Sequence, residues 1–135
     1  MHEQTLIIAM TALAGGLGAV LRFVVDGAVT ARLARRVRGQ VYPWGVTVVN
    51  VSGSFAIGLL AGVLPSGHPL LAVLGIGLLG GYTTFSAASY DTVRLLRRGR
   101  IVAGLSNSVG QLIVAVLSAW LGVLLGALLG ALSVR

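Results

Sequence analysis

The sequence predicts an all-α membrane protein with four transmembrane helices. Of its 135 residues, 56% are hydrophobic and only 10% are charged, whereas a soluble domain carries about 25% charged residues. The mean hydropathy of +0.97 agrees with this class. Because a spanning helix needs about 20 apolar residues, the length accommodates four spans and little else. We expect one transmembrane domain over residues 1–135, and we do not expect an enzyme.

The first half of the chain contains two predicted spans. The first covers about 5–25, with Arg22 near its end, and a basic connector follows it. The second covers about 45–64 and is preceded by Trp44, an aromatic residue of the kind found at membrane interfaces. The composition of residues 65–69 then predicts a tight turn.

The second half contains a polar interruption within an apolar span. The third span covers about 70–95, and its segment 80–86 reads GGYTTFS. Glycines and hydroxyl groups are tolerated at membrane depth where they are buried in protein or line a water-filled path. We therefore predict a break in the helix near 80–86 and a functional site there. The fourth span covers about 101–132, is longer than a bilayer requires, and is expected to tilt.

The arginines predict the orientation in the membrane. Eight of them fall in the connectors after the first and third spans: Arg32, Arg35, Arg36, Arg38, Arg94, Arg97, Arg98 and Arg100. The opposite side carries only Arg135. The positive-inside rule then places both connectors in the cytoplasm and both termini outside it. Binding of anionic lipid head groups by these connectors is compatible with the same orientation.

Small residues at four-residue spacing predict close contact between helices. A pair occurs in the second span and a longer stripe in the fourth: Gly58 and Gly62, then Ser118, Gly122, Gly126 and Gly130. Such stripes allow helix backbones to approach within a bundle or a dimer. The residues that we assign to packing or dimer contact are Arg22, Gly122 and Gly126.

Neutral hydrogen-bonding groups dominate the polar content of the spans. The carboxylates Glu3, Asp26 and Asp91 all lie away from the middle of a span, which argues against a proton-coupled pump. Three spans instead carry a polar face, made of Thr47, Asn50 and Ser54; of Thr83, Thr84, Ser86 and Ser89; and of Asn107, Gln111 and Ser118. Interhelical hydrogen bonds explain any single face, whereas three faces in one small bundle favour a lined pathway.

These groups suit a small anion or polar solute. Amide N–H and hydroxyl O–H groups donate hydrogen bonds without a fixed charge, so they can replace part of an anion's water shell and still release the ion. The edge of the Phe85 ring is also electropositive. The residues alone do not name the ion.

The whole chain resembles the Fluc (also called CrcB) family of fluoride channels. Three motifs carry the resemblance: Gly15 and Gly16 followed by Arg22, the second-span signature PWGVTVVN at 43–50, and GGYTTFS at 80–86. The third is the most specific. The resemblance implies passive export of fluoride across the cell membrane by an antiparallel dimer of four-helix subunits with two narrow pores.

The resemblance also implies sites. It implies a structural sodium ion, not transported, at the backbone carbonyls of Gly80 and Thr83, where carbonyls freed from helical bonding suit a hard cation. It assigns Asn50 and Phe85 to the pore, with the hydroxyl groups of the break beside them. With the polar face of the fourth span, the pore candidates are Asn50, Thr84, Phe85, Ser86, Asn107 and Gln111.

The chain departs from the family pattern at several positions. Ala88 stands where the family usually has a second Phe, and an alanine offers no ring edge to an anion. Ala87 replaces the usual Thr, Asp91 the usual Glu, and Val46 a Thr.

The arginine bias predicts one orientation, whereas the family architecture needs an antiparallel partner. We therefore expect a heterodimer with a homologous subunit of opposite charge bias, with a homodimer as the other possibility. One alternative function is a non-conducting structural subunit of such a pair. Another is a small multidrug exporter, which needs a glutamate inside the first span, whereas Glu3 precedes that span.

Overall fold

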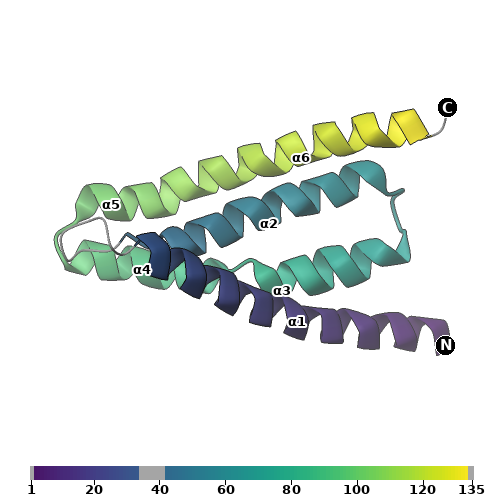
Figure 1. Ribbon diagram of the computed structural model, residues 1–135, viewed down its shortest axis with the longest axis horizontal. Helices are drawn as coiled ribbons and strands as arrows, with labels where there is room; N and C mark the ends of the chain where they lie inside the picture. The colour runs from purple at the N-terminus through teal and green to yellow at the C-terminus, as the bar shows by residue number, and fades with distance from the viewer. Residues whose placement is uncertain (1, 34–41, 134–135) are drawn as a thin grey trace.

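Four long helical segments run along one axis of the molecule (Figure 1). The computed structural model describes residues 2–33 and 42–133. Its elements in chain order are α1 (His2–Leu33), α2 (Trp44–Val63), η2 (Leu71–Leu79), α3 (Gly80–Tyr82), α4 (Phe85–Arg97), α5 (Ile101–Leu105), η3 (Ser106–Gly110) and α6 (Gln111–Ser133). Four stretches are long and apolar enough to cross a membrane, and no strand occurs in the described ranges. The predicted class of four membrane helices is confirmed.

The ends of the helices divide between the two ends of the molecule. The start of α1, the turn after α2 and the end of α6 lie together at one end, and the α4–α5 turn lies at the other (Figure 1). Helix α1 continues to Leu33, beyond the predicted span 5–25. Arg32, Arg94 and Arg97, which we expected in connectors, instead belong to the last turns of α1 and α4. Four of the predicted arginines lie outside the described residues: Arg35, Arg36, Arg38 and Arg135.

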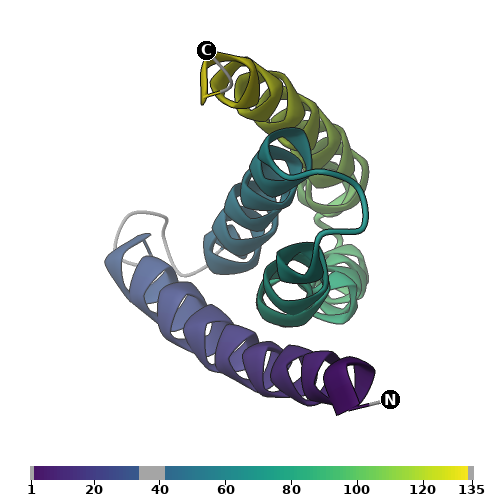
Figure 2. The same cartoon turned by 90° about the vertical axis from the view of Figure 1, so that its right-hand side faces the viewer.

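Helix α2 is central and packs most closely on α6 (Figure 2). Its glycines permit this, because a Cβ atom on Gly58 would collide with the Ala119 carbonyl oxygen and one on Gly62 with that of Val123. From the other side, a Cβ atom on Gly122 would collide with the carbonyl oxygen of Phe55. The glycine stripes therefore bring backbone against backbone within one chain.

Helix α1 packs in the same way, through glycines, against the third helical segment (Leu71–Arg97). A Cβ atom on Gly18 would overlap the Leu78 carbonyl, and one on Gly81 would overlap that of Gly15. The segment η2 that receives α1 is wound as a π-helix, whose final bonds include that from the Gly80 N–H to the Gly75 carbonyl five residues earlier. Gly81, the second glycine of the 80–86 motif, thus serves close packing as well.

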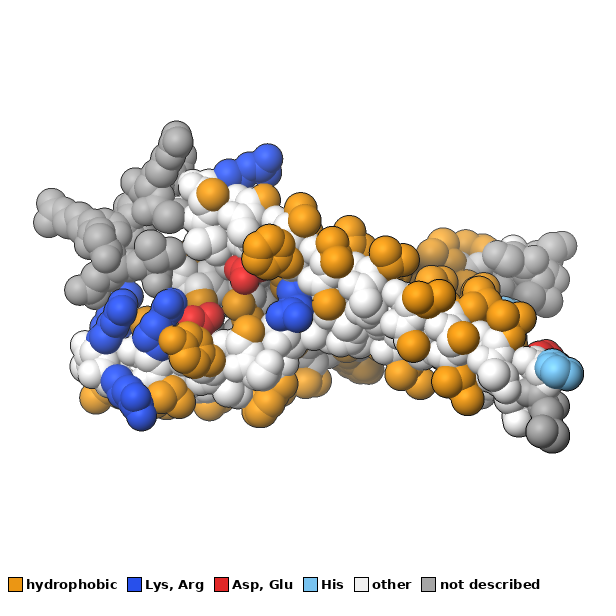
Figure 3. All heavy atoms as spheres, turned by 90° about the horizontal axis from the view of Figure 1, so that it is seen from below, with side chains coloured by type: hydrophobic (Ala, Val, Ile, Leu, Met, Phe, Trp, Pro, Cys, Tyr) orange, Lys and Arg blue, Asp and Glu red, His pale blue; other side chains and the backbone are white. Residues whose placement is uncertain are grey.

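The outer surface is apolar over most of its length. In the face shown in Figure 3, hydrophobic side chains cover the part of the molecule near the termini, whereas arginines gather toward the end that holds the α4–α5 turn. Among the described residues, few apolar side chains are buried, and Val49 is the one with no exposed surface. This distribution fits a helical bundle whose exposed face is solvated by lipid.

Candidate functional site

The helix direction is interrupted at two residues in the middle of the third segment. Helix α3 ends at Tyr82, where Thr83 adopts φ −76° and ψ 156°. Thr84 is also extended, with φ −150° and ψ 120°, and α4 begins at Phe85. The last helical hydrogen bond before the interruption runs from the Thr83 N–H to the Leu79 carbonyl at 2.9 Å. Two successive peptide units therefore need partners from elsewhere in the chain.

Asn50 of α2 supplies those partners to Thr84. Its Nδ2 donates to the Thr84 carbonyl at 2.9 Å, and its Oδ1 accepts from the Thr84 N–H at 2.8 Å. In an unbroken helix that N–H would donate to the carbonyl of Gly80, four residues earlier. The side chain of Asn50 thus substitutes for a helical partner and relieves the Gly80 carbonyl of this bond. Because Thr84 donates through its N–H and accepts through its carbonyl, the pairing also fixes the positions of Oδ1 and Nδ2 in the Asn50 amide.

Gly53, one turn after Asn50, makes room for the interrupted segment. A Cβ atom there would overlap the Thr83 side chain and lie 3.0 Å from the Tyr82 ring. Beside it, the Ser52 and Tyr82 hydroxyl groups are 3.1 Å apart. Sequence reasoning missed Gly53, although its place three residues after Asn50 puts both on one helical face.

Thr84 also caps helix α4. Its Oγ1 accepts from the Ala87 N–H at 3.2 Å and lies 3.2 Å from the Ser86 hydroxyl. A threonine at this position satisfies one of the free N–H groups at a helix start. The N-terminus of a 13-residue helix, with its positive potential, is thereby placed in the middle of the bundle.

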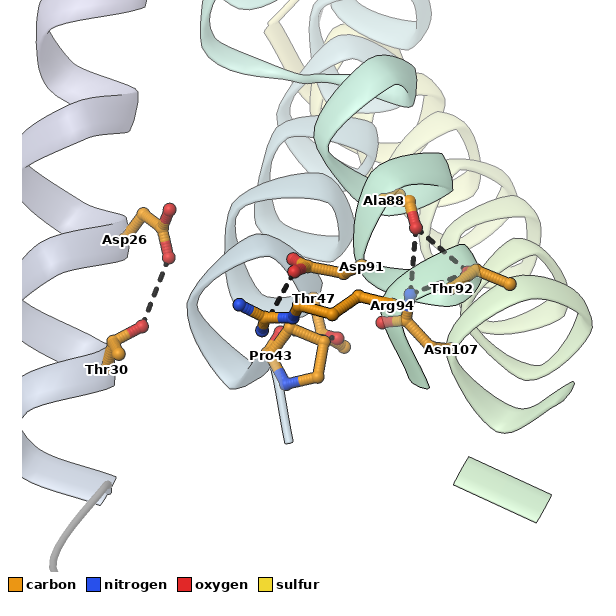
Figure 4. Close-up of polar contacts among 9 residues, drawn as sticks. All are labelled: Asp26, Thr30, Pro43, Thr47, Ala88, Asp91, Thr92, Arg94 and Asn107. Carbon is orange, nitrogen blue, oxygen red and sulfur yellow. Dashed lines mark hydrogen bonds and ion pairs between the residues drawn. The ribbon is translucent and has the colours of Figure 1, made fainter. Parts of the chain in front are cut away.

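Asn107 ties the start of the fourth segment to α4 (Figure 4). It is 1% exposed, and its Nδ2 donates to the Ala88 carbonyl at 3.0 Å and to the Thr92 hydroxyl at 2.8 Å. Its Oδ1 is buried and has no hydrogen-bond partner among the described residues. Thr92 was not predicted as a site residue from the sequence, although it lies one helical turn after Ala88. Nearby, Gln111 is 6% exposed and its Oε1 accepts from the Thr47 hydroxyl at 3.4 Å.

A groove of about 580 Å³ collects these groups between α2, α4 and the fourth segment. The polar residues that line it are Asn50, Ser54, Thr83, Thr84, Ser89, Thr92, Asn107, Ser108 and Gln111, and Phe85 and Ala88 are among the others. Among the described residues, no charged side chain belongs to this lining. The structure therefore gathers five of the six pore candidates around one groove, with Ser86 adjoining Thr84.

Phe85 projects away from the rest of the chain. It is 88% exposed, the most exposed large hydrophobic residue in the described ranges. Ser86, the next residue, is exposed as well. The rim of the groove thus presents an aromatic ring and a hydroxyl group outward.

The remaining candidates lie apart from the groove. Gly122 and Gly126 pack on α2, against the carbonyls of Phe55 and Leu59. Arg22 lies on α1, with its Nε buried and without a hydrogen-bond partner among the described residues.

The two carboxylates near the basic end have partners. Asp91 on α4 pairs with Arg94 at 3.0 Å, and Asp26 on α1 accepts from the Thr30 hydroxyl at 3.2 Å (Figure 4). A Cβ atom on Gly45 would overlap the Asp26 carboxylate, so Gly45 allows α1 to pack on the start of α2. These contacts support the bundle next to the groove.

Comparison with known proteins gives consistent relatives. Residues 9–123 match the family described as CrcB-like protein, Camphor Resistance (CrcB). The protein named fluoride-specific ion channel FluC 1 of Leifsonia xyli subsp. xyli is 44% identical over 122 residues, covering 87% of this chain and 85% of that protein. The protein named fluoride-specific ion channel FluC of Novosphingobium aromaticivorans is 42% identical over 120 residues, covering 85% and 91%.

A relative from Mycobacterium tuberculosis, named fluoride-specific ion channel FluC 2, is 42% identical over 111 residues, which cover 82% of each chain. Most of the chain is thus matched both by the family and by relatives well above 30% identity. The resemblance drawn from three sequence motifs is confirmed. With its four membrane-spanning helices, the chain belongs to the CrcB family of multi-pass membrane proteins.

Proposed function

We propose that this chain is a subunit of a fluoride-specific ion channel that lowers cytoplasmic fluoride by passive export. Relatives at 42–44% identity carry that name. The observation that carries the proposal is the polar groove, since it is lined by neutral amides and hydroxyls in a bundle that is otherwise apolar. Such a lining in a membrane protein marks a route for a polar solute.

The groove offers donors of moderate strength to an anion. Asn50 uses one amide hydrogen on the Thr84 carbonyl, and an amide nitrogen carries two, so one remains for a ligand. The N-terminus of α4 adds free N–H groups and a favourable potential for negative charge. Because none of the lining residues is charged, an ion bound here can also leave, as conduction requires.

An antiparallel dimer completes the proposed site. One chain provides only an open groove, and its rim exposes 88% of Phe85 together with the Ser86 hydroxyl. A second subunit that covers this rim would remove exposed polar groups from lipid and close the groove into a pore.

A structural sodium ion fits the same arrangement. The Gly80 carbonyl is relieved of its bond from Thr84, and the extended Thr83 cannot present its carbonyl to a helical donor. Two carbonyl oxygens suit a hard cation but do not fill its coordination shell. A second subunit would contribute the others.

The charge distribution supports a particular orientation and partner. Eight arginines belong to the α1–α2 and α4–α5 regions of the sequence. The positive-inside rule places that end in the cytoplasm and both termini outside. An antiparallel partner of opposite charge bias would satisfy the same rule, so we propose a heterodimer with a homologous subunit.

Fluoride efflux from liposomes tests the proposal. The chain is reconstituted alone and with a homologous chain of opposite charge bias, and fluoride release is followed with an electrode after the membrane potential is collapsed. The pair is expected to release fluoride and to retain chloride in matched vesicles. Retention of fluoride by vesicles that contain the folded pair would refute the channel function.

Ala88 favours a second candidate, a non-conducting structural subunit. It lines the groove where the family resemblance implies a ring, and the groove has space for one. If the missing ring limits conduction, Ala88→Phe should raise the efflux of the pair, whereas Ser52→Ala, outside the groove lining, should leave it unchanged. An Asn50→Leu change that leaves efflux intact would assign conduction to the partner's half of the dimer and support the structural role.

A further inference from the structure

A second groove, which shares no lining residue with the polar groove, lies at the basic end of the molecule. It has a volume of about 590 Å³ and lies between the start of α2 and the α4–α5 turn. Its principal groups are Tyr42, Trp44, Arg100 and Ser106. The Tyr42 and Trp44 rings are in contact at an interplanar angle of 52° with centroids 4.8 Å apart, and the Tyr42 hydroxyl lies 3.5 Å from that of Ser106. The groove thus joins an aromatic wall to a guanidinium group.

The turn between α4 and α5 sets the position of Arg100. Gly99 has a φ of +71°, a conformation that glycine adopts without strain. The Gly99 N–H donates to the Leu96 carbonyl at 2.9 Å, and the Arg100 N–H donates to that of Leu95 at 3.0 Å. This pair of bonds is a Schellman motif, which ends a helix with a fixed change of direction. The backbone of this turn therefore fixes the position of Arg100 at the groove.

Arg100 has no counter-charge in the described part of the chain. The one ion pair there joins Asp91 to Arg94, and Asp26 accepts a hydrogen bond from Thr30. No described residue accepts a hydrogen bond from the Arg100 side chain, and the exposed Arg97 and Arg98 add positive charge beside it. A half-buried guanidinium with such neighbours favours an anionic partner.

The aromatic residues locate this anionic partner at the membrane surface. Tyrosine and tryptophan prefer the head-group level of a bilayer, and Trp44 is 45% exposed at the first position of α2. Ile101 and Val102, also in the groove, begin an apolar segment 32 residues long. A ligand here would meet lipid chains on one side and arginines on the other.

We propose that this groove binds the phosphate head group of an anionic phospholipid, with Arg100 as its principal charge contact. The Tyr42 and Ser106 hydroxyls and the Trp44 indole are the neutral donors around it. The upper part of an acyl chain would lie along Ile101 and Val102. This proposal assigns lipid binding to one defined groove, and not to diffuse electrostatic attraction by the arginine-rich end as a whole.

The two tryptophans allow a direct test, because Trp44 lies in the groove and Trp120 is 64% exposed on α6, far from it. The full-length chain carrying Trp120→Phe is reconstituted in phosphatidylcholine vesicles that contain a small fraction of a brominated lipid. Quenching of Trp44 by brominated phosphatidylglycerol is compared with quenching by brominated phosphatidylcholine. We expect an apparent association about 5-fold higher for the anionic lipid, which corresponds to about 1 kcal/mol for one arginine near the surface.

Matched variants separate the groove from general charge. Arg100→Gln should remove the preference, Arg100→Lys should retain most of it, and Arg97→Gln, with the same loss of charge on an exposed side chain, should leave it intact. The Trp44→Phe chain, which reports from Trp120, should show equal quenching by both lipids. This comparison of the two reporters needs no change at Arg100, so it holds even if an Arg100 variant fails to fold.

Three outcomes would overturn the proposal. Equal quenching of Trp44 by the two lipids would show that the groove has no head-group preference. Equal losses in Arg97→Gln and Arg100→Gln would indicate diffuse attraction. Abolition of the preference by millimolar inorganic phosphate would assign the groove to a free anion. None of these readouts depends on fluoride transport, so the proposal is independent of the channel function.

Discussion

The two halves of helix α2 are packed in opposite ways. Along residues 55–63, backbone meets backbone, since glycines of α2 and α6 rest on the carbonyls of the facing helix. Along residues 44–54, α2 meets the fourth segment through side chains such as Thr47 and Gln111, and Asn50 and Ser54 border a groove of about 580 Å³. The Ser118 hydroxyl, which donates to the Val51 carbonyl at 2.9 Å, lies near the change between the two regions.

This difference separates scaffold from site on a single helix. Close glycine contacts leave no space for a solute, and they gain dispersion along the whole interface. In the other half, the polar groups satisfy backbone peptides that the interrupted segment leaves open, and some of their donors remain free. The glycine-packed half of α2, residues 55–63, thus fixes the position of the half that borders the groove, residues 44–54. The comparison predicts different consequences for substitutions in the two halves.

The largest effect is expected in the glycine interface. Gly122→Leu places a Cβ atom on the Phe55 carbonyl oxygen, so the two helices must separate. We expect the free energy of unfolding to fall by about 3 kcal/mol, as for severe overpacking. Thermal unfolding in detergent, followed by circular dichroism, measures this change.

Gly27 provides the matched control for that substitution. A Cβ atom at Gly27 would meet no atom within 4 Å, so Gly27→Leu should be nearly neutral. Similar melting temperatures for the two variants would contradict the packing account of the α2–α6 contact.

A smaller loss of stability, with a larger loss of transport, is expected at Asn50. Asn50→Asp keeps an acceptor for the Thr84 N–H but loses the donor to the Thr84 carbonyl. Leaving that carbonyl unpaired costs about 1–3 kcal/mol, and a carboxylate would repel an anion in the groove. We expect this repulsion to raise the free-energy barrier for fluoride by at least about 1.4 kcal/mol. Fluoride efflux from vesicles should then fall at least about 10-fold, since each 1.4 kcal/mol corresponds to about one decade in rate.

Ser52→Ala is the control for Asn50→Asp. Ser52 is on the same helix and pairs with the Tyr82 hydroxyl, but it does not line the groove. If both variants transport fluoride at the parent rate, the Asn50–Thr84 pairing has no part in conduction.

Smaller effects are expected from loss of the α4 cap and from loss of the Thr47 hydroxyl. Thr84→Val retains the shape of the side chain and the β-branch that suits an extended residue, but removes the oxygen that accepts from Ala87. Unfolding should require about 1 kcal/mol less, the usual value of an N-cap. Thr47→Val loses only bonds of 3.3 and 3.4 Å and should cost less, below about 0.5 kcal/mol. Denaturant titration of both variants ranks them, and a larger cost for Thr47→Val would reverse the assignment.

Local patterns were sufficient to predict the helices. The length and apolar composition predict four of them, and the glycine spacing predicts faces for close contact. Helical periodicity is a local property, so one sequence is enough to recognise it. The helix ends differ from the prediction, and α1 in particular extends to Leu33 because Thr30, Ala31 and Arg32 can all continue a helix beyond the predicted span.

Long-range partners could not be predicted in this way. Asn50 and Thr84 are 34 residues apart, and Asn107 and Ala88 are 19 apart. Asn50, Thr84 and Asn107 were identified as polar residues of the spans, but a side-chain amide can serve a ligand or a peptide equally well. Gly53 and Thr92 gained their importance only through contacts with Thr83 and Asn107.

The sequence by itself determined the membrane class, the four helices and the family, because composition, hydrophobic length and short motifs are sufficient for each. It also pointed to segment 80–86, where glycines and hydroxyls would be costly in lipid. Only the tertiary structure decided that the glycine stripes of α2 and α6 face each other within one chain, and that Asn50 holds the Thr84 peptide. The physical reason is that a helix has several equivalent faces, and its neighbours are chosen by packing and by the pairing of every buried peptide group.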